Sequence, residues 1–417
     1  MTGKKPRLLF ISPVFLFPND AGGKIRSTNV LRGLKGGAFD VTLLSPAGHG
    51  EQQAWAAALS TACDEFISWP AASPTPRWRR AVDLFADLPV NVAVDQRPAA
   101  RAAVQTAIAG GAFDLVVFDF VHSAVLMPEH IDAATVCFTH NVEAEIFARH
   151  AQTAASALMR AVWRSQHLKM QRYEGDVLRR FTHVVAVSER DGQQFRQAYG
   201  LREVSAIPTG VDLDHFSWQP PPDVKPPTVV FTGSMDWQAN IDGVRYFLDD
   251  IWPLVLRSVP DARFVVVGRN PPTALVEKAK SMTGVSFTGF VDDVRPYVHG
   301  AQAFVIPLRV GGGTRIKAFE AMAMGCPMVS TSIGVEGLDI HEGQHFLRGD
   351  SAQAFAAEVV RLLKSPTVCM DISQRARQCV ESQFGHRVAA EAFERICLRA
   401  LADHDSQAVN APLAATA

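Results

Sequence analysis

Short apolar runs alternate with amphipathic stretches along the first half of the chain. The runs occupy residues 7–13, 40–46, 65–70, 115–120, 135–140 and 183–188. A continuous apolar run of this length is typical of a strand that is buried on both faces. Strands that alternate with helices predict an α/β fold with a doubly wound parallel sheet.

The same alternation of apolar runs and amphipathic stretches returns in the second half, after a proline-rich segment. Residues 207–228 read IPTGVDLDHFSWQPPPDVKPPT, and their prolines suit a semi-rigid linker and not a helix or a central strand. Later strands are predicted at 229–233, 263–268, 285–290, 303–308 and 327–331, and the clearest helix lies at 244–259. We therefore expect two doubly wound, Rossmann-like domains.

The pattern also sets the expected domain boundaries. They are an N-terminal Rossmann-like domain at 1–208, a Pro-rich linker at 209–227 and a C-terminal Rossmann-like domain at 228–385. A helix at 386–402 is expected to cross back to the N-terminal domain. Residues 403–417 lack periodicity, so we expect a disordered tail there.

An unusual corner lies at 303–331, in AFVIPLRVGGGTRIKAFEAMAMGCPMVST. The three glycines at 311–313 let the backbone approach a ligand, because no Cβ intervenes. They lead into a helix predicted to begin near Thr314, and first-turn N–H groups of a helix can bind an anion. Arg315 and Lys317 add positive charge, so the corner predicts a site for a diphosphate.

Glu320 is the one acid on the apolar face of this helix, which it shares with Ile316, Phe319 and Ala323. An unpartnered carboxylate is costly to bury, so we expect a polar partner, and ribose hydroxyls would supply two donors. The alternative is that Lys317 and Glu320 form a surface pair at i, i+3 and that the glycines only turn the chain.

Composition narrows the possible partners and compartment. The chain has 41 Lys and Arg against 42 Asp and Glu, so no global field recruits nucleic acid. The six cysteines are scattered without a C-x-x-C pair, which favours free thiols in a reducing cytosol. The N-terminal apolar run is too short for a signal peptide or a membrane span. We expect a cytoplasmic protein that can touch a membrane from that side.

Glycines and polar residues collect where the predicted strands end. They are Gly22, Gly23, His140, Asn141 and Ser188 in the first half, and Gly233, Ser234, Arg269 and residues 289–293 in the second. Open α/β sheets bind ligands beyond the C-terminal ends of their strands, so each sheet should carry a ligand-binding edge. Two such edges imply a cleft between the domains.

Several motifs stand in order along the chain: GGKIRSTNVLRGL, FTHNVEAE, VVAVSERD, IPTGVD, FTGSMDWQANIDGVRYF, VSFTGFVDDV and GGGTRIKAFEAMAMGCPMVST. From Arg7 to about Leu401 the sequence resembles the GT-B fold glycosyltransferases of family 4, and within them bacterial exopolysaccharide-type sugar transferases. The resemblance implies transfer of a sugar from a nucleotide diphospho-sugar to a glycan or lipid-linked glycan hydroxyl, with retention of configuration. It makes the first domain the acceptor domain and the second the donor domain.

The resemblance also implies roles for single residues. Glu320 matches the glutamate that holds the nucleotide ribose, and the loop of Phe290, Val291, Asp292 and Asp293 matches the segment along the base. Gly22 and Gly23 match the loop that faces the donor phosphates and the acceptor. His140 matches a residue near the transferred sugar, with the alternative that it only caps a strand end.

Two departures from the family pattern matter. The usual motif has a first glutamate eight positions before Glu320, where this chain has Gly312. Many relatives also carry an Arg and a Lys after the first strand of the donor domain, where this chain has Ser234 to Trp237. The expected burden of donor binding therefore falls on Thr314, Arg315, Lys317 and Glu320, beside the predicted binding residues Gly312 and Gly313.

The expected mechanism needs no metal. Two cations, Arg315 and Lys317, and a helix N-terminus can stabilise the leaving diphosphate. No Asp-x-Asp motif stands in a suitable loop, and no His/Cys cluster has ligand spacing. A nucleotide-sugar epimerase and a catalytically silent nucleotide-sugar-binding scaffold are the alternatives. Residues 74–90, with Trp78 and Arg79, predict either an interfacial or acceptor-binding segment or a solvated basic helix end.

Overall fold

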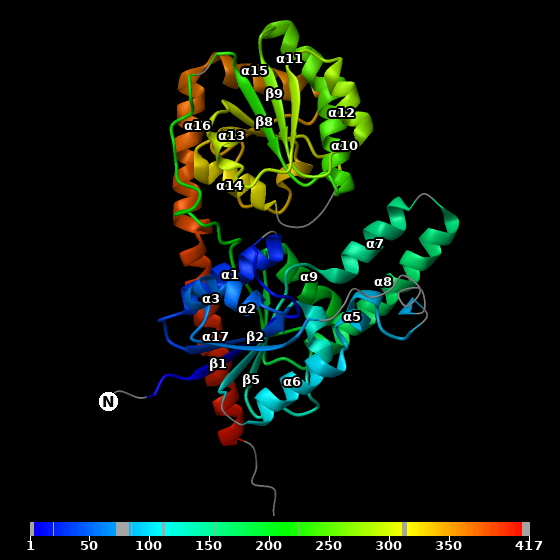
Figure 1. The fold of residues 1–417 in the computed structure, drawn as a ribbon, viewed down its shortest axis with the longest axis vertical. Coiled ribbons are helices and arrows are strands. Elements are labelled where there is room, and N and C mark those ends of the chain that lie inside the picture. Colours follow the sequence, from blue (N-terminus) through cyan, green and yellow to red (C-terminus); the bar gives the residue numbers. More distant parts are fainter. Residues whose placement is uncertain are drawn as a thin grey trace, which may run out of the picture. The chain divides into compact units, whose positions relative to one another are not determined.

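The chain folds into two compact units (Figure 1). The computed structural model describes residues 4–19, 21–71, 83–84, 86–110, 113–154, 156–223, 225–310 and 315–410. Unit 1 comprises Met1–Gly210 with His386–Ala417, and unit 2 comprises Val211–Gly385. The division between Gly210 and Val211 falls inside the segment predicted as a linker. Both units are doubly wound α/β structures, which confirms the predicted fold class.

Unit 1 is built on a parallel sheet with the order β3-β2-β1-β4-β5-β6-β7. Its strands are β1 (Arg7–Ile11), β2 (Asp40–Ala47), β3 (Glu65–Pro70), β4 (Leu115–Asp119), β5 (Ala134–Phe138), β6 (His183–Ala186) and β7 (Val204–Ala206). Sequence analysis missed β7, because three residues with one fully buried side chain give no apolar run. The chain reverses its winding between β1 and β4, where a ligand site is expected at the C-terminal ends.

Helices cover both faces of this sheet. One face packs against α1 (Gly22–Leu34), α3 (Ala56–Ala62) and α17 (His386–Asn410). The other packs against α6 (Pro98–Ala109), α8 (Ala157–Leu178) and α9 (Glu189–Tyr199). Shorter elements are α2 (Glu51–Ala54), α5 (Val90–Asp95), η1 (Val121–Leu126) and α7 (Glu143–Thr153). Alternate strand residues enter the two cores, as expected of a sheet buried on both faces.

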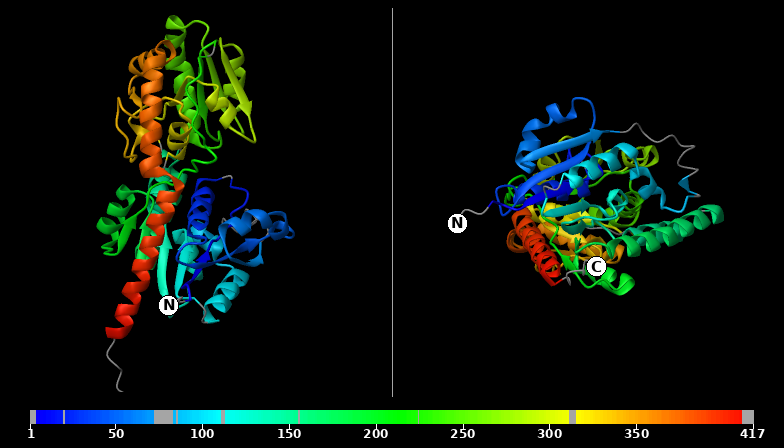
Figure 2. Two further views of the ribbon diagram at one scale, coloured as in Figure 1. Left: turned by 90° about the vertical axis from the view of Figure 1, so that its left-hand side faces the viewer. Right: turned by 90° about the horizontal axis from the view of Figure 1, so that it is seen from below.

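The C-terminal helix α17 runs further than predicted. It continues through Asn410, so residues 403–410 are helical and not disordered, and residues 411–417 lie outside the described part. Extending an existing helix costs little, because only its first turn carries the nucleation penalty. Figure 2 shows α17 lying along the strands of unit 1, where Phe393, Cys397 and Ala400 enter the core.

Unit 2 has a second parallel sheet, with the order β10-β9-β8-β11-β12-β13. Its strands are β8 (Thr228–Thr232), β9 (Arg263–Val267), β10 (Val285–Gly289), β11 (Ala303–Ile306), β12 (Met328–Ser330) and β13 (Leu347–Arg348). The two-residue strand β13 was not predicted, and it is too short to show a pattern. Here the winding reverses between β8 and β11, so the loops after these strands form the expected ligand edge.

The helices of unit 2 include a long helical run that begins earlier than predicted. Residues 238–258 form α10 (Gln238–Tyr246), the π-helical η2 (Phe247–Ile251) and α11 (Trp252–Ser258). The other elements are α12 (Thr273–Lys280), α13 (Arg295–His299), α14 (Ile316–Met324), η3 (Ile333–Val335), α15 (Ala352–Lys364), α16 (Pro366–Cys379) and the π-helical η4 (Val380–Phe384). Helix α14 is the helix predicted at the glycine corner.

Two further expectations concern cysteines and membrane spans. All six cysteines are buried and none forms a disulfide, as predicted. In the described part of the chain, every helix is too short or too polar to cross a bilayer.

We predict that Gly33→Ala loosens α17 from α1. An added Cβ at Gly33 would lie 2.0 Å from the Cβ of Ala390, so the two helices must separate. Such overpacking typically costs about 1–3 kcal/mol. Urea denaturation should show reduced stability of unit 1 with unit 2 unchanged. Gly110→Ala is the control, because its φ is −61° and its nearest atom would lie at 3.4 Å. Equal stability of both variants would contradict this packing.

Candidate active site

The ligand edge of unit 2 brings Lys317 of α14 against the end of β8. Lys317 Nζ donates to Asn240 Oδ1 at 2.9 Å and lies 4.3 Å from the ring centre of Phe231. A Cβ on Gly233 would stand 2.7 Å from Lys317 Nζ and 2.8 Å from the Asn240 amide nitrogen. Glycine at 233 is therefore required by the close approach of these side chains.

Lys317 and Glu320 both have strongly shifted pKa values. Burial, with a smaller contribution from the Arg315 charge, lowers the pKa of Lys317 to about 7. Burial raises the pKa of Glu320 to about 7, against the opposing effect of Lys317. Removing a charge from water disfavours the charged form, which explains both directions. The two groups therefore titrate close to neutral pH.

The carboxylate of Glu320 has no protein partner within the described residues. No hydrogen bond or ion pair to it is found there, and Lys317 turns to Asn240 instead. The alternative of a solvated Lys317–Glu320 surface pair is therefore wrong. A half-buried acid without a partner is costly, so its acceptor atoms are available to a ligand.

Arg315 lies just before α14 and is 6% exposed. Its Nη2 donates to the carbonyl of Ile333 in η3 at 3.2 Å. The guanidinium thus lies at the ligand edge with one donor committed to backbone. The predicted binding residues Gly312, Gly313 and Thr314, with Gly311, lie outside the described residues, as do Trp78 and Arg79.

The loop after β8 is held by a small polar network. Asp236 accepts from Ser234 Oγ at 2.9 Å, from Arg269 Nε at 3.2 Å and from Asn270 Nδ2 at 3.0 Å. These bonds keep the pKa of Asp236 below its usual value. Because Arg269 is paired with Asp236, it helps to hold the conformation of this loop.

The loop after β10, predicted to lie along the base, has an exposed aromatic ring. Gly289 has φ +71°, a conformation that favours glycine, and it turns the chain at the strand end. Phe290 is 70% exposed, Val291 is half-buried and Asp292 is exposed. Such a ring offers a flat apolar surface.

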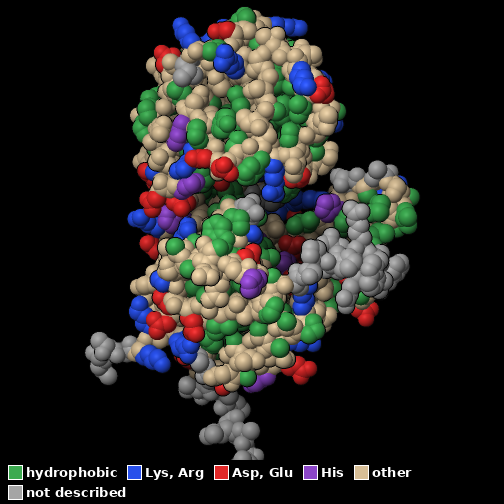
Figure 3. All heavy atoms as spheres, viewed as in Figure 1, with side chains coloured by type: hydrophobic (Ala, Val, Ile, Leu, Met, Phe, Trp, Pro, Cys, Tyr) green, Lys and Arg blue, Asp and Glu red, His purple; other side chains and the backbone are tan. Residues whose placement is uncertain are grey.

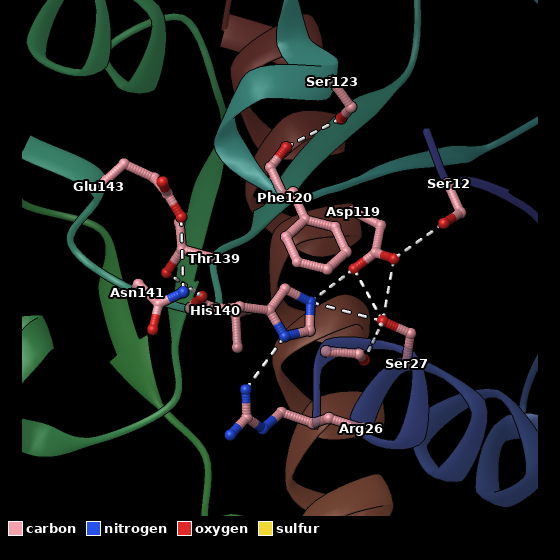
Figure 4. Close-up of polar contacts among 12 residues, drawn as sticks. Ser12, Arg26, Ser27, Asp119, Phe120, Ser123, Thr139, His140, Asn141 and Glu143 are labelled. Atoms are coloured by element: carbon pink, nitrogen blue, oxygen red, sulfur yellow. Dashed lines mark hydrogen bonds and ion pairs between the residues drawn. The ribbon is translucent and has the colours of Figure 1, made fainter. Parts of the chain in front are cut away.

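In unit 1, the corresponding edge is organised around the buried Asp119 at the end of β4 (Figure 4). Its carboxylate accepts from Ser27 Oγ of α1 at 2.9 Å and from Ser12 Oγ at 3.1 Å. It also accepts from His140 Nε2, after β5, at 2.7 Å. The chain segments that follow β1, β4 and β5 are therefore joined at one carboxylate.

The predicted site residue His140 uses both ring nitrogens within the protein. Arg26 Nη1 donates to Nδ1 at 3.0 Å, so Nε2 carries the proton that bonds Asp119. His140 is 4% exposed as a residue, and burial lowers its pKa. His140 is thus a neutral bridge between a buried cation and a buried anion. Burial also lowers the pKa of Arg26 to about 10, which leaves it charged at neutral pH.

Phe120 covers the other side of this histidine. Its ring stacks on that of His140 at 4.0 Å, and a Cβ on Gly23 would stand 2.5 Å from the Phe120 ring. Phe120 has φ +65°, an uncommon conformation for a residue with a side chain. The predicted loop residues Gly22 and Gly23, which open α1, thus pack directly beside His140.

The two remaining predicted residues of unit 1 have local roles in helix starts. Ser188 caps α9, since its Oγ accepts from Asp191 N at 3.1 Å. Asn141 Nδ2 is 3.4 Å from Glu143 Oε1, the first residue of α7. Both lie at strand ends, and neither joins the Asp119 network.

Sequence analysis missed Ser12, Ser27, Asp119 and Asn240 as site residues. Asp119 interrupts the apolar strand LVVFDF, and an acid inside such a run was a usable signal. Ser27 stands four residues after Gly23, and its Oγ also lies 3.1 Å from the Gly23 carbonyl oxygen. Asn240 carries no such signal, because a polar residue on a helix is common.

Comparisons with known proteins agree with this arrangement. The sequence model described as Glycosyltransferase Family 4 matches residues 22–215, and that described as Glycosyl transferases group 1 matches residues 226–365. The chain is 23% identical over 290 residues to glycogen synthase of Mycobacterium tuberculosis, covering 67% of this chain and 66% of that protein. It is 28% identical over 204 residues to a phosphatidyl-myo-inositol mannosyltransferase of Mycolicibacterium smegmatis, covering 47% and 52%.

A third relative is an uncharacterized 44.6 kDa protein in the cps region of Klebsiella pneumoniae, 23% identical over 163 residues. That match covers 37% of this chain and 42% of the Klebsiella protein. The chain thus spans between 42% and 66% of the length of these relatives.

Solved structures share the fold at low sequence identity. Sucrose-phosphate synthase of Thermosynechococcus elongatus has a TM-score of 0.71 at 16% identity, over 95% of this chain and 100% of that one. Anabaena HepE in complex with UDP and glucose has a TM-score of 0.62 at 14% identity, over 94% and 98%. The two consecutive family matches and the two doubly wound units show that this chain belongs to the GT-B glycosyltransferases of the family 4 type.

Proposed function

We propose that the protein transfers a sugar from a nucleotide diphospho-sugar to a hydroxyl of a glycan or lipid-linked glycan, with retention of configuration. Unit 2 binds the donor and unit 1 binds the acceptor. The observation that carries the proposal is the edge of unit 2, where Lys317 approaches Gly233 and the Glu320 carboxylate has no described protein partner. A cation and a free acid on one short helix suit a diphosphate and a ribose.

The chemistry asked of these groups is electrostatic. The acceptor oxygen bonds to the anomeric carbon, the bond from that carbon to the diphosphate breaks, and the diphosphate takes the electron pair. Lys317, Arg315 and the start of α14 place positive charge where this anion forms. The diphosphate also takes the acceptor proton, so no protein base and no metal ion are required.

The relatives support a role in cell-surface glycans. The Klebsiella relative is encoded in a cps region, and HepE was solved with UDP and glucose. We extend from these to an exopolysaccharide-type pathway and to a uridine nucleotide as the first donor to test. The exposed Phe290 after β10 is proposed to stack on the donor base.

A nucleotide screen followed by a transfer assay tests the function. One of the UDP-, GDP- and ADP-sugars should raise the melting temperature, because a ligand at 100 times its Kd adds about 2.7 kcal/mol of stability. With that donor and glycan acceptors, NMR should show a product of retained anomeric configuration. Nucleotide binding without transfer or donor hydrolysis would favour the silent scaffold, and an epimer formed without acceptor would favour the epimerase.

The shifted pKa values of Lys317 and Glu320 predict that UDP binding weakens on both the alkaline and the acid side of neutral pH. The pKa of Lys317 is lowered to about 7, so its ammonium and its attraction for diphosphate are lost as pH rises above 7. The pKa of Glu320 is raised to about 7, so the carboxylate that accepts ribose hydroxyls is lost as pH falls below 7. Affinity by calorimetry should therefore peak near neutral pH and fall up to about tenfold per unit on each side.

Single variants separate these two limbs. Lys317→Met should flatten the alkaline limb and lower kcat/KM at least about tenfold, or 1.4 kcal/mol. Glu320→Gln should flatten the acid limb and raise the donor KM. Lys280→Met, at an exposed lysine paired with Glu277, is the control. If both limbs persist in the variants, the assigned roles are incorrect.

Peripheral membrane contact is proposed through the exposed face of α8. Positions 158, 161, 165, 168 and 172, spaced three and four apart, are all exposed. Leu158 is 74% and Leu168 is 57% exposed, and residues 154–173 contain no acid but several arginines. The α7–α8 hairpin extends away from the sheet of unit 1 in Figure 2, and Figure 3 shows apolar side chains on it. Apolar and basic side chains together suit an anionic lipid surface.

Vesicle sedimentation tests this contact. The protein should bind vesicles containing phosphatidylglycerol more tightly than pure phosphatidylcholine, and Leu158→Ser with Leu168→Ser should reduce that binding at least fivefold. Leu398→Ser is the control, because Leu398 of α17 is also 40% exposed. Unchanged binding of the double variant would exclude this face.

A further inference from the structure

A second histidine on the ligand edge of unit 1 is held at only one ring nitrogen. His122 lies in η1, directly after β4, and its Nδ1 is 2.5 Å from Asp95 Oδ2 at the end of α5. The side chains are 19% and 17% exposed. Because a carboxylate only accepts, the Nδ1 of His122 carries the proton of this bond.

The other nitrogen, Nε2, is open to a ligand. Within the described residues no group hydrogen-bonds it. It is also absent from the polar atoms that are both enclosed and unpaired, so it is accessible from outside. His140 is the contrasting case, since Arg26 and Asp119 occupy both of its nitrogens. Of these two histidines, His122 is therefore the one that can contact a substrate.

His122 belongs to the same edge as the predicted acceptor residues. The centre of the Phe120 ring lies 4.0 Å from that of His140 and 5.1 Å from that of His122. Gly23 packs on Phe120, and Phe120, which contacts both histidine rings, has an uncommon positive φ. Unusual backbone of this kind persists where surrounding structure enforces it, often at ligand sites.

The charges around His122 select the kind of ligand. Asp95 contacts it directly, and Glu143 at the start of α7 and the buried Asp119 are its other acidic neighbours. Together they raise its pKa against the effect of burial. Several carboxylates near one imidazole disfavour a phosphate or a carboxylate ligand. A neutral, hydroxyl-rich ligand fits this environment, because a hydroxyl accepts from Nε2–H when the ring is protonated and donates to Nε2 when the ring is neutral.

We infer that His122, aligned by Asp95, binds a hydroxyl of the sugar acceptor through Nε2. This inference rests on the proposed glycosyl transfer, and it adds an acceptor-binding residue that none of the family motifs contains. Asp95 acts as a positioning residue: it holds the proton on Nδ1 and so turns Nε2 toward the ligand, and in the neutral ring it leaves the lone pair on Nε2.

The test uses the full chain with UDP-glucose as donor and methyl glucosides as acceptor probes. His122→Ala should raise the acceptor KM at least tenfold, with the melting temperature shift given by UDP unchanged. His122→Gln should recover part of the loss, because the Gln amide oxygen can reach the position of Nε2. Asp95→Asn should also raise the acceptor KM, since an amide that donates to Nδ1 moves the proton to Nε2. His130→Ala, at an exposed histidine, is the control.

The outcomes separate this inference from the proposed function. A wild-type protein that transfers glucose, with acceptor KM unchanged in His122→Ala and Asp95→Asn, would overturn the role of His122 alone. A raised acceptor KM that comes with a smaller UDP-induced shift and a lower melting temperature would show that the pair only holds η1 against α5. If His122→Ala does not fold, His122→Gln and Asp95→Asn decide by the same readouts. A wild-type protein that is stabilised by none of the UDP-, GDP- and ADP-sugars and transfers no sugar would count against the proposed function itself.

Discussion

The ligand edge of unit 1 depends on the buried charge of Asp119. A fully buried carboxylate needs hydrogen bonds and a compensating charge. Here neutral His140 donates to Asp119 and accepts from the guanidinium of Arg26. Ser12 and Ser27 satisfy the remaining acceptor positions. Since these groups come from the segments after β1, β4 and β5, one electrostatic requirement fixes three loops at once. The loop glycine Gly23 and the ring of Phe120 then close over the same histidine.

At the ligand edge of unit 2, the buried charges of Lys317 and Glu320 are not paired with each other by a hydrogen bond. Lys317 donates to an amide and lies over an aromatic face, and Glu320 has no hydrogen-bond or ion-pair partner in the described part of the chain. Desolvation brings both pKa values to about 7. A site that keeps its own charges uncompensated gains more from a ligand that supplies the opposite charge and hydroxyl donors. The Asp119 network of unit 1 is therefore fully paired without a ligand, whereas Glu320 has no partner among the described residues of unit 2.

The sequence predicted the fold well, because buried parallel strands leave an unmistakable apolar run. It failed where an element is too short to leave one, as for β7 and β13, and at the end of α17, where weak periodicity was taken for disorder. The helix period placed Glu320 on the apolar face of α14, and its shifted pKa agrees with that position. The role of His140 was not predictable in the same way. Whether a histidine at a strand end is open or enclosed depends on Arg26 and Asp119, which only the tertiary structure brings together.

Strand order explains why the functional residues come from distant parts of the sequence. In a doubly wound sheet, the loops after the first strand and after the first strand of the reversed winding meet at one point. In unit 1 this juxtaposes Ser27 with Asp119, and in unit 2 it juxtaposes Gly233 with Lys317. His122 follows from the same rule, because it stands two residues beyond Phe120 at the end of β4. A histidine at this place, with one ring nitrogen held and the other open, lies where ligands of doubly wound sheets bind. An open ring nitrogen on a histidine elsewhere on the surface would need no explanation beyond its contact with water.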